Sequence, residues 1–136
     1  MIERIGISLD SKLLKQFDKL IGSKGYSNRS EAVRDLIREK LIEQEWAAPE
    51  GETVATVLLV YEHETMELSQ RLTKLEHEEF HCIVSSMHVH MDHENCLEIL
   101  VLRGPGRKIQ KLGERLISTR GVKQGRFIPG TLGSRI

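Results

Sequence analysis

The residues with the clearest chemical potential are two histidines and a cysteine in the second half of the sequence. His88 and His90 lie two positions apart, and Cys96 follows the polar residues 92–95. Side chains two positions apart in a β-strand point to the same face. If residues 92–95 form a tight turn between antiparallel strands, Cys96 returns beside His90. Two imidazoles and one thiolate then lie within reach of a single metal ion.

This set of ligands limits the metal without selecting one. Imidazole and thiolate suit nickel, copper, zinc or cobalt, and they exclude magnesium and calcium, which prefer oxygen ligands. A fourth ligand has to come from elsewhere, and His77, near the end of the preceding predicted helix, is a candidate. The remaining histidines, each taken alone, are interpreted as ordinary surface residues: His63, His81 and His93.

The elements around the hairpin predict a small α+β domain. Strands are expected at residues 53–61, 82–91, 96–102 and from about 122, and amphipathic helices at residues 65–79 and around residues 109–116. This order, β-α-β-β-α-β, is that of the ferredoxin-like fold. Met87, Val89 and Met91 alternate with the histidines, and we expect them to face the core. Residues 104–106 predict a turn, and no Gly-Lys-Ser/Thr follows them as in a phosphate-binding loop.

The start of the chain predicts a different kind of unit. Residues 4–9 alternate strictly, with Ile5, Ile7 and Leu9 on one face, which indicates a half-buried strand. The other face carries three residues that could meet DNA: Arg4, Gly6 and Ser8.

Two helices are expected to follow this strand. Asp10 or Ser11 can cap the first, which ends near Gly22, and residues 28–31 are typical of a capping box that opens a second helix reaching about Trp46. One strand and two helices in 46 residues cannot bury a sufficient core. We therefore expect a dimer, in which two copies of the strand pair over a shared core of four helices.

Composition and charge agree with a globular, two-part protein. Net charge is zero, yet residues 47–102 hold two Lys/Arg against eleven Asp/Glu and all six histidines, while residues 103–136 hold nine against one. An acidic, histidine-rich block suits a cation site, and a basic flank suits an anion; mutually neutralising solvated faces are the other interpretation. No apolar stretch is long enough for a membrane span, so we expect a cytoplasmic protein without a membrane partner. Cys82 and Cys96 are too few for a disulfide scaffold.

These segments resemble a known family, the nickel-responsive transcriptional regulators or NikR family, over essentially the whole chain. The hairpin motif, from His88 to Ile99, is the most specific part, and its combination with the N-terminal segment is more specific still. The matching stretches are residues 28–32 with Arg34 and Asp35, residues 61–64, His88-Val89-His90, His93 and Cys96-Leu97-Glu98-Ile99. One departure is Gly6, where the family often has a threonine, which puts the operator sequence in doubt.

The resemblance implies a domain plan and a metal site. It implies a ribbon-helix-helix DNA-binding domain at residues 1–46, a linker at 47–51, and an ACT-like (ferredoxin-like) domain for nickel binding and tetramerisation at 52–136. One nickel ion per subunit would be bound in a square plane, with Glu98 orienting a ligand from behind. The implied nickel ligands are His88, His90 and Cys96 of one subunit and His77 of a neighbour.

The resemblance also implies partners. The expected assembly is a homotetramer, a dimer of dimers, on double-stranded operator DNA. Glu31 and Asp35 match carboxylates that hold a secondary cation between the two domains. The residues expected to contact DNA are Arg4, Gly6 and Ser8 in the strand, and Asn28, Arg29 and Ser30 at the start of the second helix.

Three functions fit these features to different degrees. The leading one is a nickel-dependent regulator, a repressor of nickel-uptake genes. The alternatives are a regulator of the same architecture that senses another metal, and a metal chaperone that does not bind DNA. The arginine and small residues on the exposed face of the ribbon count against the chaperone. A metal hydrolase would need an open coordination position, which four protein ligands would close, so we expect no enzymatic activity.

Overall fold

The leucine- and valine-rich segments of the second half of the chain form one antiparallel sheet. The computed structural model describes residues 1–48, 50–62, 64 and 66–136. Among them the sheet has four strands in the order β2-β3-β1-β4, which is the ferredoxin-like arrangement predicted from the sequence. The strands are β1 (Glu52–Glu62), β2 (Ile83–His90), β3 (Asn95–Pro105) and β4 (Val122–Pro129).

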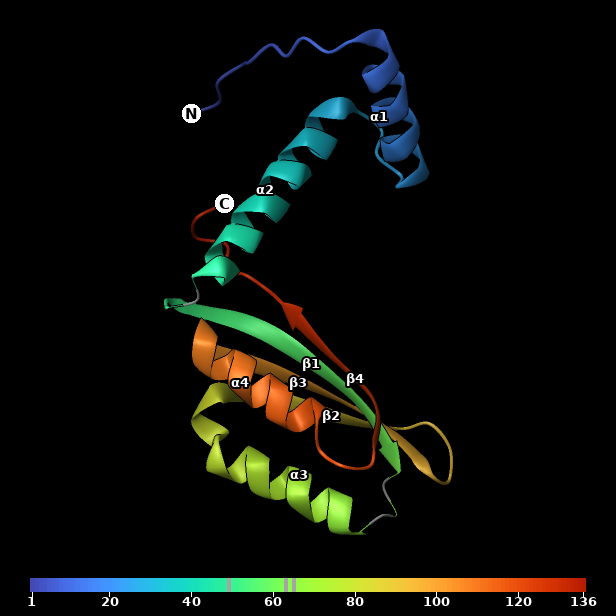
Figure 1. Cartoon of the computed structure of the whole chain (residues 1–136), viewed down its shortest axis with the longest axis vertical. Coiled ribbons are helices and arrows are strands. Elements are labelled where there is room, and N and C mark those ends of the chain that lie inside the picture. The colour runs from blue at the N-terminus through green and yellow to red at the C-terminus, as the bar shows by residue number, and fades with distance from the viewer. Residues whose placement is uncertain (49, 63, 65) are drawn as a thin grey trace. The chain divides into compact units, whose positions relative to one another are not determined.

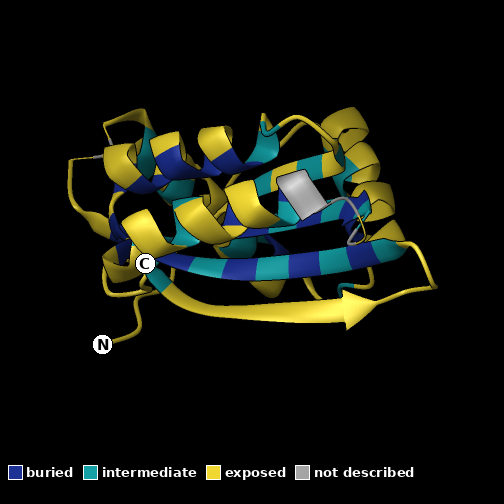
Figure 2. Cartoon of the chain, turned by 90° about the horizontal axis from the view of Figure 1, so that it is seen from below, coloured by how far each residue is buried: buried dark blue, intermediate teal, exposed yellow. Residues whose placement is uncertain are grey.

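Two helices cover one face of this sheet, as Figure 1 shows. They are α3 (Met66–Glu78) and α4 (Gly106–Ile117), and a short 3-10 turn, η1 (Phe80–Cys82), joins α3 to β2. The predicted start of α3, Thr65, lies outside the described residues. β1 and β3 alternate between buried and less buried positions, which Figure 2 shows as dark blue and teal bands along a strand. The core therefore lies between the helices and one face of the sheet, and includes Leu59, Leu72, Leu100 and Ile109.

The histidines of β2 lie on the core side of the sheet, opposite to the prediction. His88 pairs with Glu98 and His90 with Cys96, and both partners are buried. Residues paired across an antiparallel ladder share a face. The intervening residues point to the uncovered face, where Met87 is 55% exposed and Val89 39% exposed; Met91, just after the strand, is 50% exposed. The prediction that Met87, Val89 and Met91 face the core is thus wrong for the single chain.

The first part of the chain holds two helices, α1 (Ser11–Ser23) and α2 (Arg29–Ala47). Asp10 caps α1, because its carboxylate accepts hydrogen bonds from the backbone N–H groups of Lys12 (2.8 Å) and Leu13 (3.1 Å). α1 continues one residue past Gly22. The chain then turns at Gly25, whose φ of 83° suits a residue without a Cβ.

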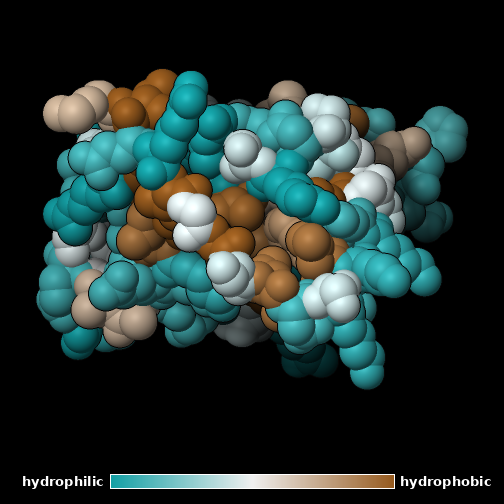
Figure 3. All heavy atoms as spheres, turned by 90° about the horizontal axis from the view of Figure 1, so that it is seen from above, coloured by the Kyte–Doolittle hydropathy of each residue, from teal (hydrophilic) through white to brown (hydrophobic). Residues whose placement is uncertain are grey.

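Residues 1–10 form no strand in the single chain, so the predicted pairing of this strand with a second copy stays a prediction. A strand needs hydrogen bonds to a neighbouring strand, and the first unit offers none within one chain. The apolar residues of the segment are correspondingly exposed: Ile5 is 76% exposed and Ile7 62%. Figure 3 shows hydrophobic side chains that reach the surface of the chain among hydrophilic ones.

The chain divides into two compact units, Met1–Leu41 and Ile42–Ile136. The last turn of α2 belongs to the second unit, where the indole N–H of Trp46 donates to the carbonyl of Gly130 at 2.9 Å and its ring meets Phe127 edge-on. The predicted domain limit at residue 46 and the linker at 47–51 stay a prediction, and Pro49 in that linker lies outside the described residues. No helix among those described is long and apolar enough to cross a membrane.

Candidate metal centre and nucleic-acid surface

The hairpin of β2 and β3 has the register that a metal site at Cys96 needs. Its turn is fixed by Asp92, whose carboxylate accepts hydrogen bonds from the backbone N–H groups of Glu94 (2.8 Å) and Asn95 (2.7 Å). Hydrogen bonds from the Asn95 side chain, and then these backbone bonds, lower the pKa of Asp92 to about 2. The turn therefore sets His90 opposite Cys96 without depending on a metal.

Cys96 and His88 are the two predicted ligands that lie closest. The Cys96 Sγ is 3.9 Å from the His88 Nδ1, and Cys96 is only 1% exposed. Typical metal–sulfur and metal–imidazole bonds of about 2.3 and 2.1 Å sum to about 4.4 Å. Because 3.9 Å is shorter than this sum, one ion can bond to both atoms. The pair fits a thiophilic metal ion on distance and on donor type.

Glu98 lies directly behind His88 and is fully buried. Its Oε1 is 3.4 Å from the His88 Nε2, and its Oε2 accepts a 2.6 Å hydrogen bond from the Tyr61 hydroxyl. Burial, and then the Glu98 carboxylate, raise the pKa of Tyr61, so this phenol stays protonated and keeps donating. A carboxylate held in this way can fix the orientation of a ligating imidazole.

Glu76 joins this cluster, and the sequence analysis missed it. Donor atoms of Glu76, His88 and Glu98 lie within 4.8 Å of one another. Burial raises the pKa of Glu76 to about 9, with further contributions from a hydrogen bond to Glu98 and from its charge. The signal was available in the sequence, because Glu76 continues the apolar stripe of Leu68 and Leu72 at four-residue spacing.

Two predicted ligands do not join the cluster within one chain. Among the described residues, donor atoms gather into two groups of three, and neither group contains His90 or His77. His90 lies opposite Cys96 in the ladder, but its side chain is exposed at the strand end. His77 is exposed in the last turn of α3. One chain thus brings together Cys96, His88 and Glu98 and leaves His77 on its surface.

The predicted DNA-contacting strand residues are all exposed: Arg4, Gly6 and Ser8. At the start of α2, Asn28 acts as a cap, since its side-chain oxygen accepts from the N–H of Glu31 at 2.9 Å. Arg29 makes two 2.8 Å hydrogen bonds to Asp18, which lower the pKa of that carboxyl. Its guanidinium therefore links α2 to α1.

Ser30 is exposed in the first turn of α2, where free N–H groups favour an anion.

The carboxylates expected to hold a secondary cation already have partners in the first unit. Glu31 forms an ion pair with Arg34. Asp35 accepts a 2.6 Å hydrogen bond from the Tyr26 hydroxyl and lies 3.3 Å from a nitrogen of Arg38. A cation between Glu31 and Asp35 would have to displace these contacts.

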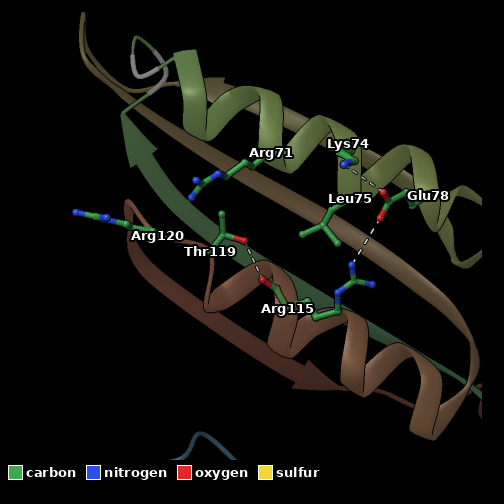
Figure 4. Close-up of a pocket in the computed structure, with 7 residues that line it drawn as sticks. All are labelled: Arg71, Lys74, Leu75, Glu78, Arg115, Thr119 and Arg120. Atoms are coloured by element: carbon green, nitrogen blue, oxygen red, sulfur yellow. Dashed lines mark hydrogen bonds and ion pairs between the residues drawn. The ribbon is translucent and has the colours of Figure 1, made fainter.

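A basic pocket of about 390 Å³ opens between α3 and the end of α4, shown in Figure 4. Among the described residues that line it, Glu78 is the only acid, and it lies 3.6 Å from Arg115 and 3.9 Å from Lys74. The excess of positive charge favours an anion and disfavours a metal ion. Its lining residues are Arg71, Lys74, Leu75, Glu78, Arg115, Thr119 and Arg120.

Comparison with known families agrees with both units. Residues 54–128 match the NikR C-terminal nickel-binding domain, and residues 3–44 match the ribbon-helix-helix proteins of the copG family.

Whole-length relatives carry the provisional name of nickel-responsive regulator. One from Anaeromyxobacter dehalogenans is 54% identical and covers 98% of this chain and 97% of its own. One from Solibacter usitatus is 50% identical over 99% of this chain and 97% of its own, and one from Caldanaerobacter subterraneus is 47% identical over 99% and 88%.

A solved structure shares the fold of part of the chain. It is an uncharacterized protein from Thermotoga maritima, 19% identical, with a TM-score of 0.52, covering 58% of this chain and 98% of its own.

Proposed function

The chain belongs to the family of nickel-responsive regulators, and we propose that it is a nickel-dependent, DNA-binding repressor of nickel-uptake genes. The observation that carries the proposal is the hairpin. It sets the Cys96 Sγ 3.9 Å from the His88 Nδ1, with a buried carboxylate behind the histidine. Nickel would supply the bonds that tie these ligands together, one ion per chain.

The four proposed ligands are His88, His90 and Cys96 of one subunit and His77 of a neighbour. The exposure of His77 supports this arrangement, because a residue on the outside of α3 is free to meet a second copy. Glu98 and Tyr61 position His88 from the core side. Glu76 is the additional positioning residue that the structure brings into this group.

A homotetramer, a dimer of dimers, is part of the proposal. Each unit exposes apolar residues that one chain cannot cover: Ile5, Ile7 and Leu9 in the first, and Met87, Val89 and Ile128 on the open sheet face in the second. Two copies of residues 4–9 would pair into a ribbon. Two copies of the open face would pack in the centre.

DNA recognition would use the outer face of that ribbon. A two-stranded ribbon fits the major groove, where an arginine can bind guanine O6 and N7. Arg4 would read a base edge, with Gly6 and Ser8 allowing close approach. Asn28, Arg29 and Ser30 would position the helix end on the phosphates. Glu31 and Asp35 would hold a secondary cation only after exchanging their present partners.

Nickel absorption spectroscopy tests the metal part of the proposal. Titrating nickel into the metal-free protein should produce a thiolate-to-nickel band of square-planar type that saturates at one ion per chain. Saturation with copper or zinc at far lower free concentration, without such a nickel band, would favour a regulator of another metal. If the protein binds nickel but retains no DNA fragment, it would act as a chaperone, and the regulatory part of the proposal would be wrong.

A further inference from the structure

A second group of metal-ligating residues lies at the junction of α3 and β2. Donor atoms of Glu79, His81 and Cys82 lie within 4.8 Å of one another. Glu79 follows α3, and His81 and Cys82 lie in the η1 turn. The group shares no residue with the hairpin cluster, and Cys82 lies just before β2, at the end of that strand far from His88 and His90.

A cation, the ammonium of Lys108, already lies beside this group. The ammonium of Lys108, on α4, is 2.5 Å from the His81 Nε2 and 4.0 Å from the Glu79 Oε2. An ammonium has only donors, so this contact is a hydrogen bond in the tautomer whose Nε2 accepts through its lone pair. That is the state in which imidazole binds a metal ion.

The carboxylate of Glu79 is a second feature that suits a metal ion. Its Oε2 is buried and makes no hydrogen bond to the described residues. Buried carboxylate oxygens are normally hydrogen-bonded, since an unsatisfied one costs free energy. The atom lies 3.6 Å from the His81 Nε2, on the side where Lys108 now supplies the positive charge.

We propose that Glu79, His81 and Cys82 form a second metal site, which takes a borderline divalent ion of the zinc or cobalt class in place of Lys108. One thiolate, one imidazole and one carboxylate are a three-ligand set for such an ion, with a fourth position left for water. The thiol of Cys82 loses its proton to solvent as the metal–sulfur bond forms. Burial raises the pKa of this thiol, which Lys108 partly offsets.

Nearby positive charge makes this site weaker than the hairpin. Arg115 lies 3.7 Å from the Glu79 Oε1 and stays beside any bound ion. Lys108 can leave, because its side chain is 47% exposed and its stem is flexible. Removing the competing ammonium should therefore strengthen metal binding, which a merely structural cluster would not show.

The site would also constrain the nickel ligand on α3. His77 lies two residues before Glu79, in the last turn of the helix. An ion that bonds to Glu79 and to the η1 turn would hold this turn in place. The position of His77 would then depend on a metal other than nickel.

Cobalt(II) alone is a suitable probe, since its bond to a thiolate gives a near-ultraviolet band. Cys82 and Cys96 are the only cysteines in the sequence. In Cys96→Ala chains any such band has to come from Cys82. We expect the band to appear with one cobalt per chain, and to disappear in the Cys96→Ala, Cys82→Ser double variant.

Substitutions of exposed residues test the site without disturbing the fold. His81→Ala in the Cys96→Ala chain should weaken cobalt binding at least tenfold, Lys108→Ala should strengthen it, and His93→Ala, on the hairpin turn, should leave it unchanged. If Cys96→Ala does not fold, the same variants are read in nickel-loaded wild-type protein by the added cobalt band. No Cys82-dependent band, or equal affinity in His81→Ala and its parent, overturns the proposal.

Discussion

The two compact units differ in what covers their apolar residues. Ile21 and Ala32 are the only buried hydrophobic residues that the structure describes in the first unit, whereas the second buries a continuous core that includes Val57, Leu59 and Leu100. Each unit contains a segment of alternating apolar residues, which is residues 4–9 in the first unit and β1 in the second. β1 finds β3 and β4 as neighbours within the chain, while residues 4–9 find none.

An alternating pattern therefore predicts which face of a strand is apolar, but it does not predict what covers that face. We propose that a second copy covers the first unit, because residues 4–9 have no strand partner within one chain. The second unit buries a core of its own and brings Cys96, His88 and Glu98 together within one chain. In that unit the proposed partner supplies only His77 and a cover for the open sheet face.

The largest expected effect concerns the part of the site that the second unit forms alone. Cys96→Ala should abolish the thiolate-to-nickel band and weaken nickel binding by several orders of magnitude. The loss should exceed the roughly 10- to 100-fold cost of disturbing residues behind a metal ligand.

Cys82→Ala is the matched control for that substitution. It should leave the band that forms with the first equivalent of nickel unchanged, because Cys82 lies just before β2, at the end of the strand far from His88. Loss of that band in Cys82→Ala, and its survival in Cys96→Ala, would show that the hairpin register does not form the site.

A pair of isoleucines tests the contrast between the units directly. Ile109→Ala in the buried core of the second unit should lower the free energy of unfolding by about 2–5 kcal/mol. Ile7→Ala should cost a similar amount only if a second copy covers this residue; as a surface substitution it would stay within about 0.5 kcal/mol.

Urea unfolding at several protein concentrations measures both variants. Ile7→Ala should make the free energy of unfolding depend more strongly on protein concentration, because the substitution makes dissociation of the copies easier. Ile2→Ala, at a position 91% exposed and outside the alternating segment, is the control. An Ile7→Ala protein as stable as Ile2→Ala would contradict the ribbon.

Base recognition is expected to depend on the first unit, and single substitutions there should cost less binding free energy. Arg4→Ala should weaken binding to the preferred sequence by about 1–3 kcal/mol per contacted base and flatten discrimination between sequences. Arg29→Ala should weaken binding to all sequences alike. Fluorescence anisotropy on preferred and random duplexes at one salt concentration compares them; an equal loss on both duplexes for Arg4→Ala would refute base reading.

The smallest effect is a pH dependence confined to the second unit. Burial raises the pKa of Glu76 to about 9, so the metal-free folded state keeps a proton that the unfolded chain releases near its ordinary value. The associated stability is complete below about pH 4.5 and is lost as pH rises towards 9. The slope is less than about 1.4 kcal/mol per pH unit, because partial exposure screens it.

Unfolding between pH 6 and 8.5 checks this dependence. Glu76→Gln, which carries no titrating group, should flatten the decline. Asp18→Asn is the comparison in the first unit, because that carboxyl is exposed and its pKa is lowered instead of raised. A decline that is as steep in Glu76→Gln as in the wild type would assign it to other groups.

The sequence was sufficient for the architecture and for the register of the hairpin. Turn residues such as Asp92 act locally, so the pairing of His90 with Cys96 follows from chain order. The sequence did not predict which face of the sheet would face the core. Met87 and Val89 are as apolar as core residues, and only the docking of α3 and α4 shows that the histidine face is the covered one.

The contacts around the proposed metal site could not be predicted from local sequence patterns either. Glu76 reaches Glu98, and Lys108 reaches His81, from helices distant in sequence. Spacing rules describe neighbours on one element, whereas these contacts depend on how a helix packs on the sheet. His77 is the opposite case, since its proposed partner is on another chain.

We expect nickel and DNA to bind with positive coupling, although their proposed sites lie in different units. Nickel that joins the hairpin of one chain to His77 of another would fix the spacing of the two DNA modules, which otherwise costs conformational entropy. The direct test is to titrate the duplex that nickel-loaded protein selects from a random pool with metal-free and nickel-loaded protein at one salt concentration. We predict that nickel tightens binding tenfold to a hundredfold, about 1.4–2.7 kcal/mol. Identical dissociation constants for folded metal-free and nickel-loaded protein would show that nickel does not control DNA binding.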